Sequence, residues 1–236
     1  MRVLHSTAVA ICQPESRRIR APSAADAAVL LELDRDLPMA LPIAAPERRL
    51  QHRRSIDVQV YSRGNGLWEV DARLTDTRSR TVNLATGPRA AGDPIHDMLL
   101  RLVVDERFNV VEAGAESMSV PYPGNCDEHG DVYQKLVGLN LMQRFRETVR
   151  ARVGGVQGCT HITELAQVLP TAVVQAFAGE VIDTRGDSDS SERPFQIDRC
   201  HALRSDGPAV LAFYPRWYRP PAPAAANTES ERARTP

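Results

Sequence analysis

Cysteine and histidine side chains occur at four places in the sequence where a strand or a helix is expected to begin or end. These places are His96 with Asp97, Cys126, Cys159 with His161, and Cys200 with His201. Thiolate and imidazole ligands together suit zinc or iron, and three protein ligands leave a position open for water or a substrate. Side chains at element ends can converge from distant segments, so the sequence predicts a single-metal site. Its predicted ligands are Cys126, Cys159, His96 and His161.

Cys159 has the strongest local indication of function. Glycines in the segment 154–158 let the backbone approach closely just before it, and a helix is expected to begin at 159–161. The partial positive charge of a helix N-terminus stabilises a thiolate and lowers the pKa of the thiol. This geometry suits a metal ligand or a nucleophile, and in a catalytic site His161 or His96 would transfer protons. The same glycines are also typical of a tight connection between two helices.

Residues that are adjacent on a strand point to opposite faces of the sheet. At most one of His96 and Asp97 can therefore face a common site, and the same limit applies to Cys200 and His201. A single cysteine often packs as a small hydrophobic residue, and a single histidine often forms only a hydrogen bond across the sheet. Asp97, Cys200 and His201 are therefore secondary candidates.

Two arginines stand at the start of the first predicted strand. Arg53 and Arg54 could bind the carboxylate or phosphate of a small molecule, although exposed arginines usually form a solvated face. Glu164 falls in the first turn of the helix that opens near 159, where its charge favours the helix dipole, and it is another secondary candidate. The glycines at 64–66 join two strands and no helix follows them, so no nucleotide cofactor is expected.

Alternating apolar and polar residues predict the strands of a sheet. The predicted strands cover 54–61, 68–74, 80–84, 98–104 and 108–118. The first two are joined by a turn with two glycines, as in an antiparallel hairpin, and the almost continuously apolar fourth strand is expected at the centre of the sheet. A second hairpin is predicted near the C-terminus, over 195–203 and 209–214.

A change to helical spacing follows the strands. Apolar residues predict a short helix over 131–136 and a longer one over 141–149, which ends at a pair of glycines. A further helix is predicted with Thr160 or His161 as its N-cap, and Pro170 is expected to kink or restart it. The expected fold is α+β, with a mostly antiparallel sheet of four to five strands, two or three packed helices and the C-terminal hairpin.

The 236 residues include 29 Lys and Arg against 30 Asp and Glu, for a formal net charge of -1. This balance argues against a dedicated nucleic-acid binder. No apolar segment reaches the roughly 18 residues of a membrane span, and no signal peptide is recognised, so a cytoplasmic protein without a membrane partner is expected. The expected organisation is an Ala/Pro-rich extension over 1–45 with a short helix over 24–33, a single domain over 46–219, and a disordered tail over 220–236.

Five segments carry a resemblance to a known bacterial family. They are GLWEVDARLTDT (Gly66–Thr77), GDPIHDMLLRL (Gly92–Leu102), LVGLNL (Leu136–Leu141), GGVQGCTHITEL (Gly154–Leu165) and CHALRSDGP (Cys200–Pro208). Together they resemble the family described as domain of unknown function 2889, over most of the chain. That family carries no assigned activity, so the resemblance implies a family without implying a mechanism.

A second resemblance is to the NifU/IscU iron–sulfur scaffold fold. In that fold one cysteine precedes a strand, a second follows the next strand, and a third opens the last helix beside a histidine. Cys126 is similar in place to the second cysteine and Cys159 to the third. Pro94 stands where the first cysteine would be and Gly158 where the histidine would be, although His161 could replace that histidine. Without the first cysteine, the resemblance implies a single-metal site rather than cluster assembly.

Three functions follow as expectations. The first is a metal-binding protein that holds Zn²⁺ or Fe²⁺ through the predicted ligands. The second is an enzyme of the lyase or hydrolase class that uses the same site on a small acidic or aromatic molecule. The third is a partner-binding module, in which these residues only pack and the surface around Trp217 is the contact. In the first two the expected partner is a metal ion or a small molecule.

Overall fold

The structure, a computed structural model, describes residues 41–128, 130–185 and 191–221. The chain divides into two units, Met1–Arg49 and Leu50–Pro236, and every helix and strand named below belongs to the second unit. The predicted helix over 24–33, most of the predicted extension and most of the predicted tail lie outside the described residues. Within the described ranges, the strands and helices confirm the α+β class.

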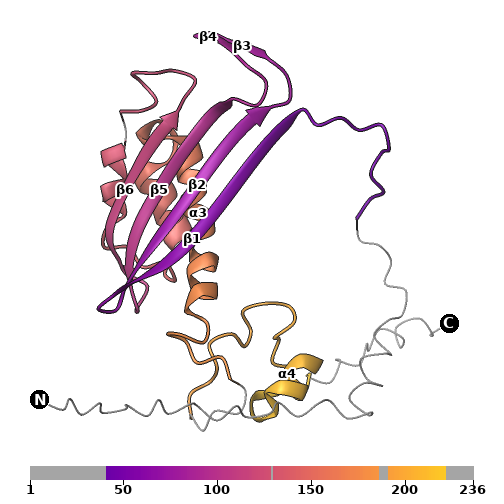
Figure 1. Ribbon diagram of the computed structural model, residues 1–236. Coiled ribbons are helices and arrows are strands. Elements are labelled where there is room, and N and C mark those ends of the chain that lie inside the picture. The colour runs from indigo at the N-terminus through magenta and orange to yellow at the C-terminus, as the bar shows by residue number, and fades with distance from the viewer. Residues whose placement is uncertain (1–40, 129, 186–190, 222–236) are drawn as a thin grey trace, which may run out of the picture. The chain divides into compact units, whose positions relative to one another are not determined.

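A four-stranded antiparallel sheet in the order β1-β2-β5-β6 forms one layer of the second unit (Figure 1). Its strands are β1 (His52–Gly64), β2 (Leu67–Arg78), β5 (Pro94–Asp105) and β6 (Val110–Ser119). The hairpin predicted from the first two strands is confirmed, and the strand predicted at the centre is β5, which pairs with both β2 and β6. A separate two-stranded sheet pairs β3 (Val82–Leu84) with β4 (Gly87–Arg89).

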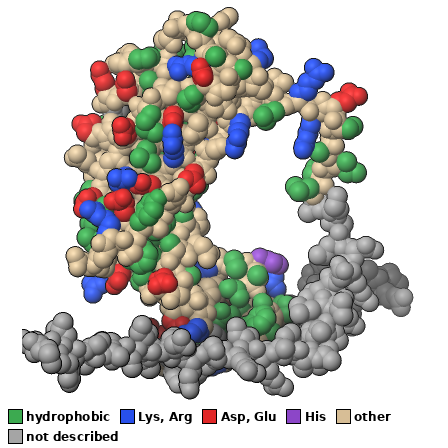
Figure 2. All heavy atoms as spheres, viewed as in Figure 1, with side chains coloured by type: hydrophobic (Ala, Val, Ile, Leu, Met, Phe, Trp, Pro, Cys, Tyr) green, Lys and Arg blue, Asp and Glu red, His purple; other side chains and the backbone are tan. Residues whose placement is uncertain are grey.

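Alternation along the strands separates a buried face of the sheet from an exposed face. The buried face includes Val70, Ala72 and Leu74 of β2 and Met98, Leu100 and Leu102 of β5. On the exposed face, Arg73 donates two hydrogen bonds to Asp97. Arg101 likewise donates two to Asp71 there. Figure 2 shows acidic and basic side chains interspersed over the surface, as expected of a sheet that packs on one face and meets solvent on the other.

Helix α3 (Thr160–Phe177) packs against the buried face of the sheet (Figure 1). Its buried side chains recur at helical spacing and include Ile162, Leu165, Ala166, Leu169, Val173 and Phe177. The ring of Phe177 lies 5.1 Å from that of Trp68 and 4.9 Å from that of Phe108, measured between centroids. The core of the second unit therefore lies between the sheet and this helix.

Shorter helices make up the rest of the described helical structure. They are the 3-10 helices η1 (Gly130–Leu136), η2 (Gly155–Gln157) and η3 (Pro215–Trp217), and the α-helices α2 (Phe145–Val153) and α4 (Pro208–Phe213). In the described ranges, no helix has the length and apolar character needed to cross a bilayer.

The predicted C-terminal hairpin is wrong. Residues 195–203 form turns and bends, and the expected second strand is helix α4 instead. Pro208 occupies the first turn of α4, where its missing N–H is not needed and its fixed φ favours a helix. Apolar alternation over so short a segment did not outweigh this local helix signal.

Two details of α3 differ from the prediction. Of the kink or restart expected at Pro170, the restart does not occur: the helix continues through Pro170 as one element, because core packing by the buried side chains Leu169 and Val173 holds both halves in place. Its N-cap is Cys159 rather than Thr160 or His161. The side chain of His161 is therefore free to point from the first turn of the helix toward the sheet.

Candidate metal centre

Neighbouring strands carry a row of polar side chains across one end of the buried face. In the strand register, Arg54 on β1 lies opposite Asp76 on β2, and Asp76 lies opposite His96 on β5. Asp76 extends the buried stripe of β2 by one position beyond Leu74, and its exposed fraction is only 3%. The sheet therefore brings a buried carboxylate into contact with an arginine and a histidine from different strands.

Asp76 accepts hydrogen bonds on both carboxylate oxygens. Arg54 donates from Nε to Oδ1 at 2.9 Å and from Nη2 to Oδ2 at 2.7 Å. His52 Nε2 lies 2.9 Å from Oδ1, and His96 Nδ1 lies 3.0 Å from Oδ2. Burial alone would raise the pKa of Asp76, but its arginine and histidine partners hold that pKa well below its usual range. Asp76 is therefore an ionised carboxylate at neutral pH.

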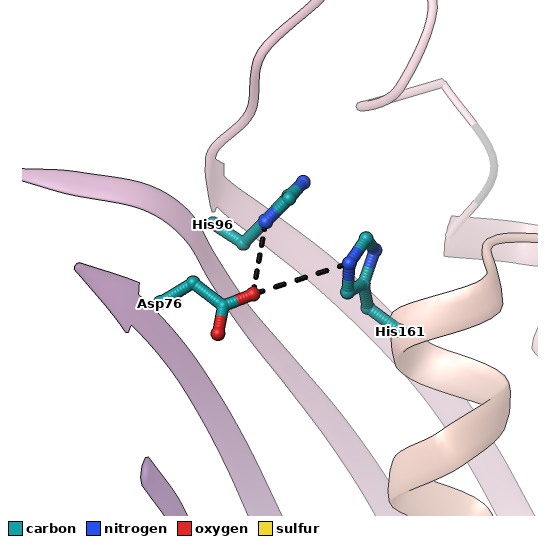
Figure 3. Close-up of side chains that lie close together, drawn as sticks. All are labelled: Asp76, His96 and His161. Atoms are coloured by element: carbon teal, nitrogen blue, oxygen red, sulfur yellow. Dashed lines mark hydrogen bonds and ion pairs between the residues drawn. The ribbon is translucent and has the colours of Figure 1, made fainter. Parts of the chain in front are cut away.

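Two side chains of α3 join this row, His161 from its first turn and Glu164, which lies beyond the first turn where the sequence predicted it. His161 Nε2 lies 3.9 Å from Asp76 Oδ2, and the rings of His161 and His96 face each other with centroids 3.9 Å apart (Figure 3). Glu164, on the same helix, accepts a hydrogen bond from Arg54 at 2.6 Å. Arg54 therefore joins β1 to both β2 and α3.

Cys159 contacts the other ring nitrogen of His161. Its Sγ lies 3.8 Å from His161 Nδ1 and 3.7 Å from Met98 Sδ. The Tyr133 hydroxyl fixes the backbone at this point, because it donates to Cys159 O at 3.0 Å and accepts from the Cys159 N–H at 2.9 Å. Burial alone would raise the pKa of the Cys159 thiol, but the hydrogen bond with His161 and the backbone N–H groups at the start of α3 lower it.

Asp76, His96 and His161 are the one group of three potential metal ligands among the described residues. Their ligand atoms all lie within 4.8 Å of one another. A tetrahedral ion with bonds of about 2.1 Å separates its ligand atoms by about 3.4 Å. That separation falls between the 3.0 Å from Asp76 Oδ2 to His96 Nδ1 and the 3.9 Å from Oδ2 to His161 Nε2. The spacing therefore fits a single ion with only small side-chain movements.

The protonation state of His96 also suits a metal ligand. Burial lowers the pKa of His96, although the charge of Asp76 opposes this shift. The imidazole is therefore neutral at neutral pH, and a neutral ring is the form that coordinates a metal ion.

A cavity of about 760 Å³ lies beside these three side chains. Its lining comes from the start of β1, the ends of β2 and β3, the start of β5, the loop before η1 and the start of α3. The apolar lining residues include Leu84, Ile95, Met98, Pro121 and Tyr122. The potential ligands are therefore accessible to a small molecule.

The structure brings together a part of the predicted site. His96, His161, Cys126, Cys159 and Arg54 all line the cavity. Within the described ranges, neither cysteine belongs to the group of three potential ligands. The two histidines of the predicted ligand set meet a carboxylate there instead of two thiolates.

Other predicted residues lie away from the cavity. Asp97 points to the exposed face, where Arg73 binds it, so His96 is the member of that pair that faces the cavity. Arg53 is exposed and does not line the cavity, because strand alternation places it on the opposite side from Arg54. The remaining candidates outside this cavity are Glu164, which binds Arg54 from α3, and the exposed residues Cys200 and His201.

Asp76 and His52 are absent from the residues that the sequence predicts for the site. The available signal is the alternation of β2, whose inward positions are Val70, Ala72, Leu74 and then Asp76. A carboxylate at an inward position is costly to bury without partners, and so it marks a polar site. His52 and Arg54 continue the inward positions of β1 in the same way.

The fold and the site together define an α+β protein with two histidines and a carboxylate clustered where a helix begins on a sheet. The chain belongs to the family described as Protein of unknown function (DUF2889), whose family model matches residues 52–175. The match contains all three potential ligands and confirms the family resemblance seen in the sequence. Neither the curated proteins nor the solved structures give a match, so no matching structure supports the similarity to the NifU/IscU scaffold.

Proposed function

We propose that the protein binds one divalent transition-metal ion, zinc or iron(II), through Asp76, His96 and His161. The observation that carries this proposal is the meeting of these side chains, from β2, β5 and α3, within 4.8 Å beside a cavity. Two imidazoles and one carboxylate are a donor set that zinc and non-haem iron(II) both use.

The surroundings of the three ligands support a bound cation. Asp76 and Glu164 carry two negative charges against the one positive charge of Arg54, so the cluster is net negative when its histidines are neutral. A histidine ligand is usually oriented by a contact to its second ring nitrogen. Cys159 makes such a contact with His161, on the nitrogen that does not face Asp76. We therefore assign Cys159 as a positioning residue and not as a ligand.

Elemental analysis of protein purified without chelator or His-tag tests the proposal. The wild-type protein should hold about one zinc or iron per chain, or take up one ion when these metals are supplied. His96→Ala and His161→Ala should lose the metal, whereas His201→Ala, which changes an exposed histidine outside the cavity, should keep it. A wild-type protein that takes up neither metal would overturn the proposal.

A second candidate function is an enzyme that uses this site on a small molecule. The observation that favours it is the cavity of about 760 Å³, which is far larger than an ion needs. Three protein ligands leave a bound ion with positions for water or substrate, and such an ion polarises a bound oxygen or activates water. Turnover by the metal-loaded protein that disappears in His96→Ala would support this candidate over simple metal binding.

A further inference from the structure

The cavity beside the proposed metal site has a positive charge that its own side chains do not balance. Asp76 is the one acidic residue of its described lining, against Arg54 and Arg78. Glu164 pairs with Arg54 from outside the lining, so with neutral histidines these four charged groups sum to about zero, and a divalent ion would raise the sum to about +2. The whole chain has a formal net charge of -1. The positive charge that can attract an anion is therefore that of Arg78, together with that of a bound ion.

Arg78 is the source of the unbalanced charge. It is the last residue of β2, two positions after Asp76 and thus on the same face of the strand, and its partner in the register is His52. Arg54 is held by Asp76 and Glu164. Among the described residues, by contrast, no carboxylate lies within ion-pair distance of the Arg78 side chain, which is exposed. Its guanidinium is therefore free to bind an anion at the cavity.

One part of the cavity wall is apolar. Leu84, Ile95, Pro121 and Tyr122 line the cavity together with Met98. Inorganic anions such as phosphate or sulfate would leave this surface unused, whereas an anion with an aromatic or alkyl body would bury it. The combination of one free guanidinium and an apolar wall thus selects an amphipathic anion.

We propose that the cavity binds a small organic carboxylate with an aromatic or alkyl body, and that Arg78 binds its carboxylate group. The planar guanidinium matches the two oxygens of a carboxylate. The proposal deepens the proposed function, because the metal ion would add to the positive charge that attracts this ligand. It names the ligand class of that site, and Arg78 as the residue that selects it.

Isothermal titration calorimetry with benzoate and hexanoate as probes tests this proposal on the zinc-supplied full-length protein. Benzoate should bind the wild-type protein, and Arg78→Gln should weaken its binding at least tenfold, because a charge-assisted pair is lost. Arg80→Gln is the matched control, since Arg80 is exposed and does not line the cavity. Its binding of benzoate should equal that of the wild type. Benzamide, which has the same ring and no charge, should bind at least tenfold more weakly than benzoate.

Two measurements on the same samples keep this inference separate from the metal proposal. Metal content is determined for each variant, and Arg78→Gln should retain the metal of the wild type. If the protein holds no metal but binds benzoate in a manner that depends on Arg78, the metal proposal fails and the carboxylate site stands. If the wild type binds neither benzoate nor hexanoate, or if Arg78→Gln or benzamide gives unchanged affinity, the carboxylate site is overturned.

Discussion

At the scale of single residues, the carboxylate of Asp76 cannot keep all its hydrogen-bond donors and also bind a metal ion. Its Oδ2 accepts from Arg54 and lies 3.0 Å from His96 Nδ1, so one proton sits between the carboxylate and the imidazole. An ion that binds both Oδ2 and Nδ1 requires the proton of the neutral ring to lie on Nε2 instead. Metal binding at this site is therefore coupled to a change of the His96 tautomer.

Asp76→Asn tests the central role of this carboxylate. The amide keeps the shape but loses the charge, and its NH2 group replaces one of the two oxygens that accept from the arginine and histidine donors. We expect the metal content to fall to background and the free energy of unfolding to fall by about 2–4 kcal/mol, as measured by elemental analysis and urea denaturation. Asp97→Asn is the control, because it breaks a similar two-bond arginine pair on the exposed face. Equal metal loss in both variants would contradict this role.

Cys159→Ala separates a positioning residue from a ligand. Because Cys159 contacts the ring nitrogen of His161 that faces away from Asp76, its loss should leave one ion per chain but weaken its affinity about 10- to 100-fold. Competition with a chromophoric chelator measures this change. A thiolate-to-metal absorption band in the cobalt(II)-substituted wild type, absent from the variant, would show instead that Cys159 is a ligand, as the sequence predicts.

At the scale of elements, most of the fold could be predicted because the spacing of apolar residues within each segment indicates whether it is a strand or a helix. The alternation of β1 and β2 and the helical stripe of α3 are local signals, and core packing reinforces them. The C-terminal region offered only short apolar runs, and there the preference of Pro208 for a helix start decided the structure. The restart expected as one alternative at Pro170 does not occur for the opposite reason, since tertiary packing around Pro170 outweighs its tendency to end a helix.

Only those residues of the candidate site that stand at the start of a strand or a helix could be predicted from the sequence. Convergence of His96 and His161 follows from a strand start and a helix start that carry ligand residues. The third potential ligand, Asp76, lies beside His96 because of the strand register. The residue pattern within a single strand does not specify that register. A carboxylate in an apolar stripe was the remaining clue.

The turn between β5 and β6 depends on one aspartate. Asp105 Oδ1 accepts the backbone N–H groups of Arg107 and Asn109, and its Oδ2 accepts the Asn109 side-chain amide. Burial alone would raise the pKa of Asp105, but these hydrogen bonds lower it. Since the folded pKa lies below the unfolded value of about 3.9, the carboxylate stabilises the fold above that pH, and this contribution is lost as pH falls through the folded pKa.

Asp105→Asn should therefore destabilise the protein at pH 7, by about 1 kcal/mol, and by less at pH 3. Urea denaturation of wild type and variant at the two pH values measures this difference. Asp93→Asn is the control, because the exposed Asp93 side chain accepts no hydrogen bond from any described residue, and it should show little difference at either pH. An Asp105→Asn effect that is as large at pH 3 as at pH 7 would contradict the role of the charge.

At the scale of the whole molecule, the proposed ion would connect the two layers of the second unit. Its ligands come from β2, β5 and α3, so the site exists only when the helix is docked on the sheet. An ion that binds the folded chain and not the unfolded chain shifts the folding equilibrium by mass action.

Zinc should therefore stabilise the protein in proportion to the logarithm of its free concentration. At a free concentration of about 100 times Kd the expected gain is about 2.7 kcal/mol, and excess chelator should remove it. Thermal denaturation with and without metal measures this gain. His96→Ala should not respond, and a response equal to that of the wild type would mean that zinc binds elsewhere.

β1 is an edge strand of the four-stranded sheet, and it supplies Arg54 and His52 to the site. Edge strands have hydrogen-bonded neighbours on one side and open more readily than central strands. Asp76 and His96, by contrast, lie on strands that are paired on both sides, and His161 is anchored through a helix buried in the core. We therefore expect any rearrangement of the contacts of Asp76 on metal binding to fall on the side of β1, with Arg54 and His52, and not on the strands and helix that carry its potential ligands.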